Sequence, residues 1–229
     1  MSERKKSLKG SWLWGALLFA VLILIDMVTK ILADAYFDVD DPYFEIIPGY
    51  LEWGLTYNRG VAFSMMKDVT PAAKMALVWS TVVLFVVFAI YYVKMDPRRT
   101  WVRVALVFII AGGVGNLIDR VYYQVWEPYS VTDPSTWDGV RDMVRLKIFM
   151  FDFGVCNFAD FFIVGGAVAL MVAILFFDAG AIFPLTAKYK ALSKEYEEKE
   201  EQRQAERLER KQERALRNME AKSIEEKEE

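Results

Sequence analysis

The sequence predicts a mainly α-helical membrane protein. We expect four transmembrane helices, a small extracytoplasmic β-sheet at the membrane interface, and a charged C-terminal tail that is helical or disordered. Three observations support this fold class. Hydrophobic residues make up 55% of the 229 positions, which is high for a soluble protein with 26% charged residues. Charges gather at the two ends and in a few loops, leaving long uncharged runs. The last segment changes abruptly to Glu, Lys, Arg and Gln, so we predict a membrane domain over residues 1–190 and a cytoplasmic tail over 191–229.

The composition excludes several kinds of chemistry. The chain contains no histidine, which excludes Ser-His-Asp triads, His-ligated zinc and a histidine general base. The single cysteine, Cys156, excludes an internal disulfide, a CxxC redox pair and an iron–sulfur cluster. With no histidine to activate it, Cys156 is expected to be a small hydrophobic residue rather than a nucleophile. An enzyme of this composition must use carboxylates, lysine or tyrosine, and we expect no metal, no cofactor and no nucleic-acid partner.

The first predicted helix covers residues 12–35 and has roughly the 20 residues that a membrane span requires. Basic residues precede it, and the A-x-A pattern at 33–35 raises the alternative of a cleaved signal peptide. Asp26 and Lys30 favour an uncleaved helix, because the apolar region of a signal peptide should carry no charge. The two are four residues apart on one helical face and can pair, either for function or merely to neutralise each other near the interface.

Short strands are predicted in residues 44–66, between the first two helices. Apolar and polar residues alternate there around a Pro-Gly turn at 48–49. Asn58 and Arg59 follow as turn residues, and considered singly they are more typical of turns than of ligand contacts. The aromatic residues expected at a membrane–water boundary are Tyr50, Trp53 and Tyr57.

The second and third predicted helices cover residues 74–93 and 102–121. The third ends in the sequence GGVGNLIDR at 112–120. Close helix packing explains its small residues. Packing does not explain the polar residues at positions i, i+3 and i+4, which form one polar face at the helix end: Asn116, Asp119 and Arg120.

The fourth predicted helix covers residues 157–177 and opens with the sequence NFAD at 157–160. An acid at the edge of a membrane helix is costly unless a partner or water stabilises it, so Asp160 is a candidate functional residue. The alternative is a helix cap, with Asn157 as the capping residue and the acid in the first turn.

Basic residues predict the topology. The basic N-terminus, the loop with Arg98 and Arg99, and the segment with Lys188 and Lys190 should share the cytoplasmic side. Both termini would then be cytoplasmic. The unusual polar groups of the helices and of the predicted sheet all lie towards the opposite, outer face. We therefore interpret them as one site.

Five motifs occur in order along the chain: DMVTK at 26–30, NRGVAFS at 58–64, GGVGNLIDR at 112–120, VRDM at 140–143 and NFAD at 157–160. Together they resemble the lipoprotein signal peptidases, the type II signal peptidases of bacteria. The resemblance covers about residues 10–180 and omits the tail.

This resemblance implies an aspartyl endopeptidase in the bacterial inner (cytoplasmic) membrane. Such enzymes remove the signal peptide from diacylglyceryl-modified prolipoproteins and cleave just before the lipidated cysteine. The expected partners are the prolipoprotein, membrane lipid and globomycin-type inhibitors. Two carboxylates held close together cannot both ionise cheaply, so one keeps a proton while the other activates water.

The resemblance implies that Asp160 is one member of the catalytic pair. Its partner is Asp142 or Asp152, which precede it by 18 and eight residues. Asp142 is favoured because it lies in the VRDM motif and near the family's separation, and Asp152 remains the alternative. The resemblance also gives substrate-holding or dyad-supporting roles to Asn58, Asn116, Arg120, Asn157, Asp26, Lys30 and Asp119.

The sequence departs from the family pattern in residues 121–139, which form a longer segment than usual, and at Cys156 and Phe161.

A different class of function is a small ion- or proton-coupled transporter, in which Asp26, Lys30, Asp119 and Asp160 would form an ion path. A transport path predicts polar groups spread through the membrane depth. Here they gather towards one face, which favours the peptidase. An inactive scaffold with a recruiting tail is a further alternative.

Overall fold

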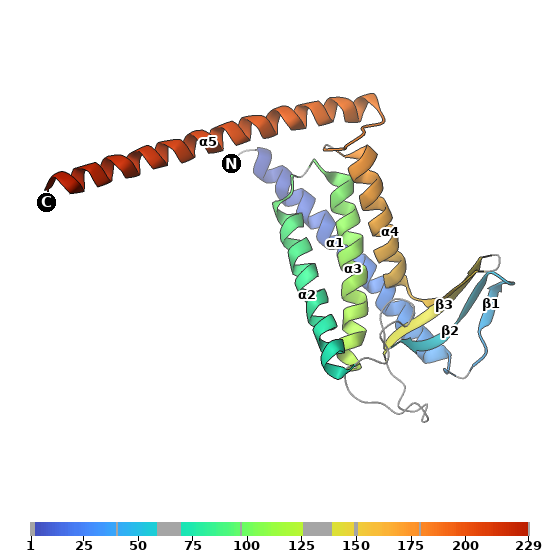
Figure 1. Cartoon of the computed structure of the whole chain (residues 1–229). Coiled ribbons are helices and arrows are strands. Elements are labelled where there is room, and N and C mark those ends of the chain that lie inside the picture. The colour runs from blue at the N-terminus through green and yellow to red at the C-terminus, as the bar shows by residue number, and fades with distance from the viewer. Residues whose placement is uncertain are drawn as a thin grey trace. The chain divides into compact units, whose positions relative to one another are not determined.

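A computed structural model describes residues 3–39, 41–58, 70–96, 98–125, 139–148, 151–178 and 180–228. The chain forms two compact units, Met1–Met171 and Val172–Glu229. The first unit combines long helices with a small sheet at one end of them (Figure 1).

The helices of the first unit are α1 (Glu3–Tyr36), α2 (Pro71–Lys94), α3 (Thr100–Tyr122) and α4 (Phe158–Val172), and α4 continues as the π-helix η3 (Ala173–Phe177). Within the described residues, four stretches are long and apolar enough to cross a membrane: Trp12–Tyr36, Pro71–Lys94, Thr100–Tyr122 and Phe158–Phe177. The prediction of four transmembrane helices is therefore confirmed. Many large apolar side chains on these helices are exposed, for example Leu24, Val83 and Val164, as expected for surfaces that face lipid.

Glycines on α3 allow neighbouring helices to approach closely. A Cβ atom at Gly112 would collide with the backbone carbonyl of Ala159 on α4 and with Ile163. A Cβ atom at Gly115 would collide with the carboxylate of Asp26 on α1. The GGVGN sequence thus packs α3 directly against the polar part of α1 and the start of α4.

A four-stranded antiparallel sheet has the order β1 (Phe44–Ile47), β2 (Leu51–Asn58), β3 (Val140–Ile148) and β4 (Phe151–Cys156). The predicted strands within 44–58 are confirmed, and residues 59–66 lie outside the described part of the chain. Strands β3 and β4 were not predicted from the sequence, and Asp152 lies in β4. These strands alternate charged with apolar residues. Their charges are satisfied by ion pairs along the sheet, such as Arg145–Asp152 and Lys147–Glu52.

The sheet packs on the end of α1. Its buried cluster consists of Leu55, Met143 and Val144 from the strands and Ala33 from α1. Asp142 is not part of this cluster, and its carboxylate instead accepts hydrogen bonds from Asn58 and Asn157. Asp142 lies opposite Thr56 of β2, two residues from Asn58. This register brings the polar end of β2 next to Asp142.

The second unit contains η3 and the long helix α5 (Ala187–Glu228). After η3 the chain folds back, and the Ile182 and Phe183 amides donate to the carbonyls of Ile174 and Leu175 over 3.0 and 2.7 Å. The predicted tail is therefore helical. Its charged side chains form pairs along the helix surface, for example Glu200 with Arg203.

Candidate active site

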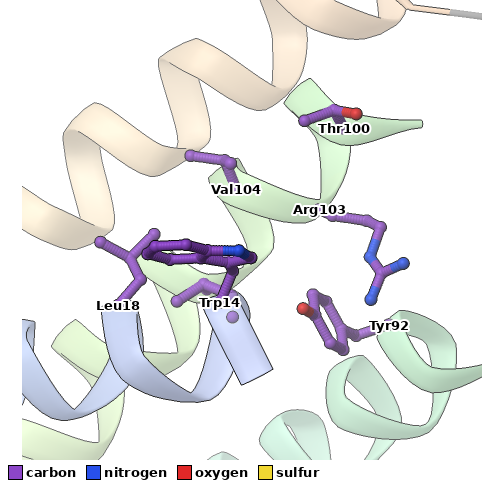
Figure 2. A pocket seen from close by; sticks show the side chains of 8 residues that line it. Trp14, Leu18, Tyr92, Thr100, Arg103 and Val104 are labelled. Carbon is purple, nitrogen blue, oxygen red and sulfur yellow. The ribbon is translucent and has the colours of Figure 1, made fainter. Parts of the chain in front are cut away.

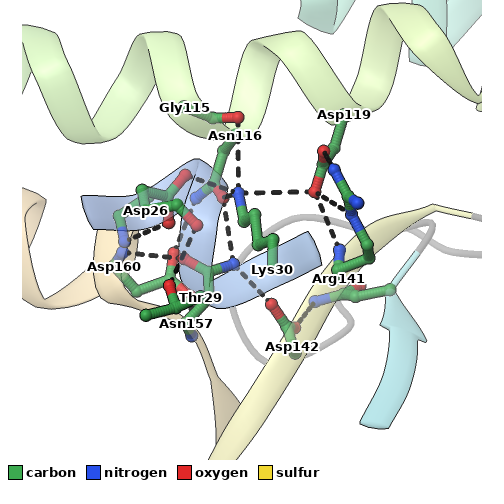
Figure 3. A network of polar contacts seen from close by, with 12 residues as sticks. Asp26, Thr29, Lys30, Gly115, Asn116, Asp119, Arg141, Asp142, Asn157 and Asp160 are labelled. Atoms are coloured by element: carbon green, nitrogen blue, oxygen red, sulfur yellow. Dashed lines mark hydrogen bonds and ion pairs between the residues drawn. The ribbon is translucent and has the colours of Figure 1, made fainter. Parts of the chain in front are cut away.

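A connected network of polar side chains lies where α1, α3, α4 and the sheet meet (Figure 3). Its centre is the ion pair of Asp26 and Lys30 on α1, with 2.9 Å between the Lys30 Nζ and the Asp26 Oδ2. Both side chains are completely buried. Asp26 Oδ1 also accepts a hydrogen bond from the Ala159 amide of α4 at 2.9 Å. The predicted pair exists, and it joins α1 to α4 rather than merely neutralising itself.

Lys30 also links α1 to α3. Its Nζ lies 3.1 Å from Asn116 Oδ1, 3.3 Å from the Gly115 carbonyl and 3.4 Å from Asp119 Oδ2. A buried ammonium group must satisfy all three of its N–H donors, and these oxygens do so. Two of the three side chains that sequence spacing placed on one polar face of α3, Asn116 and Asp119, therefore converge on this lysine.

Asp119 connects this lysine to strand β3. Its Oδ2 accepts from the Arg141 amide at 3.0 Å, and its Oδ1 accepts from Arg141 Nη2 at 2.7 Å. Asp119 is fully buried, so both contacts are sheltered from solvent. The aspartate thereby fixes the backbone position of β3 one residue before Asp142.

The start of α4 is a capping box. The Asp160 amide donates to Asn157 Oδ1, and the Asn157 amide donates to Asp160 Oδ2, both over 3.1 Å. The remaining carboxylate oxygen, Asp160 Oδ1, accepts from Asn116 Nδ2 at 2.8 Å. The interpretation of Asn157 and Asp160 as a helix cap is therefore correct. The same side chains also belong to the polar network.

Asn157 joins the two candidate catalytic carboxyl groups. Its Nδ2 donates to Asp142 Oδ1 at 2.6 Å and to Asn116 Oδ1 at 3.0 Å. On its other side, Asp142 Oδ2 accepts from Asn58 Nδ2 at 3.1 Å. One asparagine thus holds Asp142 of β3 beside Asp160 of α4, and Figure 3 shows this link.

The pKa of Asp142 is raised to about 7. Burial is the largest cause and the charge of Asp160 adds to the rise, while hydrogen bonds from Asn58 and Asn157 oppose it. The Asp142 side chain is 2% exposed. The guanidinium of Arg120 lies within electrostatic reach of both carboxyl groups. The charge of Lys30 also acts on Asp142 and opposes the rise. The amides that hold the pair are neutral, and a buried acid beside a second carboxylate favours one retained proton.

Asp152 lies in a different environment. Its carboxylate is 43% exposed and pairs with Arg145 at 2.5 Å. The hydrogen bonds from Arg145 and from the Gly154 amide lower the pKa of Asp152. Cys156 is half-buried, and burial together with the charges of Asp160 and Asp142 raises the pKa of its thiol to about 12. Neither group has the environment of a catalytic residue at neutral pH.

The sequence prediction missed Arg141 as a member of the network. Its position in the VRDM motif, directly before the catalytic candidate Asp142, is the signal that could have identified it. Arg59 lies outside the described residues. Among the described residues, no group of three or more His, Cys, Asp or Glu side chains could hold a metal ion.

Comparison with known proteins gives a consistent result. The family model described as signal peptidase (SPase) II matches residues 18–176. The lipoprotein signal peptidase of Ectopseudomonas mendocina is 32% identical over 72% of this chain and 90% of its own length. That of Deinococcus radiodurans is 32% identical over 70% of this chain and 78% of its own length. The match to the Pseudomonas putida lipoprotein signal peptidase, also 32% identical, spans 63% of that protein.

Two solved structures, each described as a bacterial membrane enzyme, share the fold. One has 25% identity and a TM-score of 0.56 and is covered over 92% of its length. The other has 24% identity and a TM-score of 0.57 and is covered over 87% of its length. Each match covers 70% of this chain.

Proposed function

The chain belongs to the signal peptidase II family, and we propose that it removes signal peptides from diacylglyceryl-modified prolipoproteins by an aspartyl mechanism. The proposed products are the free signal peptide and the lipoprotein that begins at its lipidated cysteine. The observation that carries this proposal is the bridge from Asn157 to Asp142 and Asp160.

In the proposed mechanism, Asp142 is the member of the pair that carries the proton. Its burial and its raised pKa support this role. Asp160 is the ionised member, because it lies at the N-terminus of α4, where the helix dipole and the Asn157 amide stabilise a negative charge. Asp160 takes a proton from water as the water attacks the scissile carbonyl, and Asp142 protonates the carbonyl oxygen.

Three asparagines hold the dyad without adding charge. Asn58 and Asn157 donate to Asp142, and Asn116 donates to Asp160. Arg120 supplies a positive charge near both acids and is a candidate for holding the substrate backbone. Asp26, Lys30, Asp119 and Arg141 are assigned positioning roles, because their contacts fix α1, α3 and β3 around the dyad.

The distribution of polar groups favours a peptidase over the transporter alternative. The buried residues in the middle of α3 are apolar or glycine: Ala105, Leu106, Val107, Ala111 and Gly112. Within the described residues, no chain of buried ionisable groups therefore continues from Asn116 through the depth of the helix. A transport path would need one.

We further propose an inner-membrane location with both termini cytoplasmic and the dyad near the outer face. The basic residues of the N-terminal segment, of the connection between α2 and α3, and of the Lys188 region support this orientation. Globomycin-type inhibitors should bind the same site and compete with the prolipoprotein.

The decisive experiment measures cleavage of a diacylglyceryl-modified prolipoprotein by purified full-length protein. Asp142→Asn and Asp160→Asn should each abolish cleavage, because an amide cannot exchange the shared proton. Asp152→Asn is the matched control and should keep substantial activity. Binding of the substrate is measured in parallel to exclude misfolding. An inactive Asp152→Asn together with an active Asp142→Asn would transfer the partner role to Asp152.

A further inference from the structure

A second unusual feature lies at the other end of α3. Helices α1, α2 and α3 enclose a pocket of about 420 Å³, which Figure 2 shows from close by. Arg103 lines this pocket and precedes Asn116 by 13 residues, which corresponds to roughly 20 Å along an α-helix. The pocket is therefore separate from the candidate active site.

Arg103 is buried without a hydrogen-bond partner. Arg103 is only 4% exposed. Within the described part of the chain, no group accepts a hydrogen bond from its Nε, Nη1 or Nη2. The guanidinium lies over the Tyr92 ring, whose centroid is 4.4 Å from the guanidinium carbon. A cation–π contact leaves all five N–H donors unsatisfied, and such a group is costly unless an acceptor reaches it.

The pocket combines one basic side chain with mostly apolar walls. Leu18 and Val104 contribute apolar walls, while Thr100 and the indole of Trp14 add donors beside Arg103. No acidic residue is among those that line it. Trp14 is 73% exposed, so the rest of the described protein covers only a small part of its side chain.

The surroundings indicate which anion would bind. Exposed aromatic side chains at this end of the helices, Trp14, Tyr91 and Trp101, are typical of the headgroup level of a bilayer. The connection between α2 and α3 adds Lys94, Arg98 and Arg99 against one acid, Asp96, so its charge is positive and disfavours a cationic headgroup.

We propose that this pocket binds the phosphate headgroup of an anionic phospholipid, with Arg103 as its anchor. The guanidinium donates to the phosphate oxygens, and the apolar walls hold the first carbons of an acyl chain. The tyrosine ring keeps the guanidinium oriented when no lipid is bound. This site does not depend on the proposed peptidase activity.

The test uses purified full-length protein in detergent with phosphatidylglycerol as the probe. Lipid retention is measured by native mass spectrometry, and thermal unfolding is followed in parallel. Wild-type protein should retain phosphatidylglycerol and unfold at a higher temperature with it. Arg103→Gln should retain the lipid at least about tenfold less well, because charge-assisted hydrogen bonds are lost. Lys199→Gln removes the same charge on α5, outside the pocket, and should stay close to wild type.

A second variant covers the possibility that Arg103→Gln does not fold. Val104→Phe keeps the charge of Arg103 but fills the pocket, so it should also lose lipid retention. Unchanged retention in Arg103→Gln or in Val104→Phe overturns the proposal. Equal retention of phosphatidylcholine overturns the choice of an anionic lipid. Stabilisation by inorganic phosphate alone, with no further effect of lipid, overturns the choice of a lipid headgroup.

Discussion

In the described part of the chain, neutral amide donors hold Asp142 and Asp160. Asn58 and Asn157 contact Asp142, and Asn116 contacts Asp160. A bound arginine would force a carboxylate to stay ionised, whereas an amide can support an acid in either protonation state. Lys30 and Arg141 pair instead with Asp26 and Asp119. This division leaves the proposed dyad free to exchange a proton.

The pKa of Asp142 predicts how activity changes with pH. Burial and the charge of Asp160 raise this pKa from 3.8 to about 7, so the folded protein favours the protonated acid. As pH rises through about 7, Asp142 loses the proton that the mechanism requires. This acid stabilises the folded state most below its unfolded pKa of 3.8, and that stabilisation is lost as the pH rises from 3.8 to about 7. Cleavage by purified protein should therefore fall between pH 7 and pH 9. A rate that is constant or rising there would contradict the assignment of the proton to Asp142.

Lys30 is predicted to be critical for stability. Lys30→Met would leave Asp26 and Asp119 buried without their shared ammonium group, and removing one partner of a buried pair typically costs about 3–5 kcal/mol. The measurement is unfolding of the purified variant in detergent. The double variant Asp26→Asn with Lys30→Met removes a charge of each sign and should be less destabilised than Lys30→Met alone. If the double variant loses as much stability as Lys30→Met alone, or the sum of the losses of the two single variants, then Asp26 and Lys30 are not coupled.

The site residues differ in how far the sequence could predict them. Asp26 and Lys30 could be paired from helical spacing, because the contact is local. The contact between Asp119 and Arg141 could not, because it joins residues 22 apart on different elements and depends on the register of β3. The family resemblance supplied Asp142 as a candidate, but its contact with Asn58 follows only from the pairing of β2 with β3.

The helices and strands also differ in how far the sequence could predict them. The helices were predictable because each has an apolar run long enough to span a bilayer. Strand β3 was not, because Arg141, Arg145 and Lys147 interrupt its apolar pattern. Those charges are compensated by residues elsewhere, such as Asp119 and Glu52. A strand whose charges are satisfied by tertiary contacts gives a weak signal in its own sequence.

Close packing of α3 against α4 predicts the effect of a single methyl group. Gly112→Ala would place a Cβ against the Ala159 carbonyl, which is backbone and cannot move aside cheaply. Overpacking of this kind typically costs about 1–3 kcal/mol. It would also shift the start of α4, and a displacement of about 1 Å at a catalytic group can reduce turnover about 100-fold. The measurements are thermal unfolding and prolipoprotein cleavage.

Gly165→Ala is the matched control for this substitution. It lies on α4, and no atom lies within 4 Å of the Cβ it would gain. Alanine favours a helix over glycine by roughly 0.5–1 kcal/mol, so this variant should be as stable as wild type or more so, with unchanged cleavage. If both substitutions behave alike, the close approach at Gly112 does not position the site.

At the scale of the whole molecule, the two ends of α3 have different chemistry. The end near Asn116 and Asp119 carries the proposed dyad, and the end near Arg103 carries the proposed lipid site. The buried residues between them are apolar or glycine. An apolar centre between two polar ends is what a membrane-spanning helix requires. The lipid site would then fix the depth of the helices in the bilayer and, through them, the depth of the dyad.

The distribution of basic residues predicts the orientation of the protein in the membrane. A reporter that is active only outside the cytoplasm should be silent when fused after Lys190 and active when inserted at residue 135. The reason is that short cytoplasmic segments carry the excess of Lys and Arg. Immunoblots of the membrane fraction control for the abundance of each fusion. The reverse pattern would place the dyad on the wrong side for a prolipoprotein.

The tail can be separated from the proposed chemistry. Most side chains of α5 up to residue 214 are exposed, and pairs such as Glu200 with Arg203 stabilise the helix from within. None of the network residues comes from the tail, since the last of them is Asp160. Truncation after Lys190 should therefore leave cleavage per molecule within about twofold of the full chain, because additivity is expected for distant, independent sites. Cleavage is measured with purified truncated protein and normalised to the amount in the membrane. Loss of cleavage at normal abundance would mean that α5 contributes to the reaction, through the substrate or through a contact with the membrane unit.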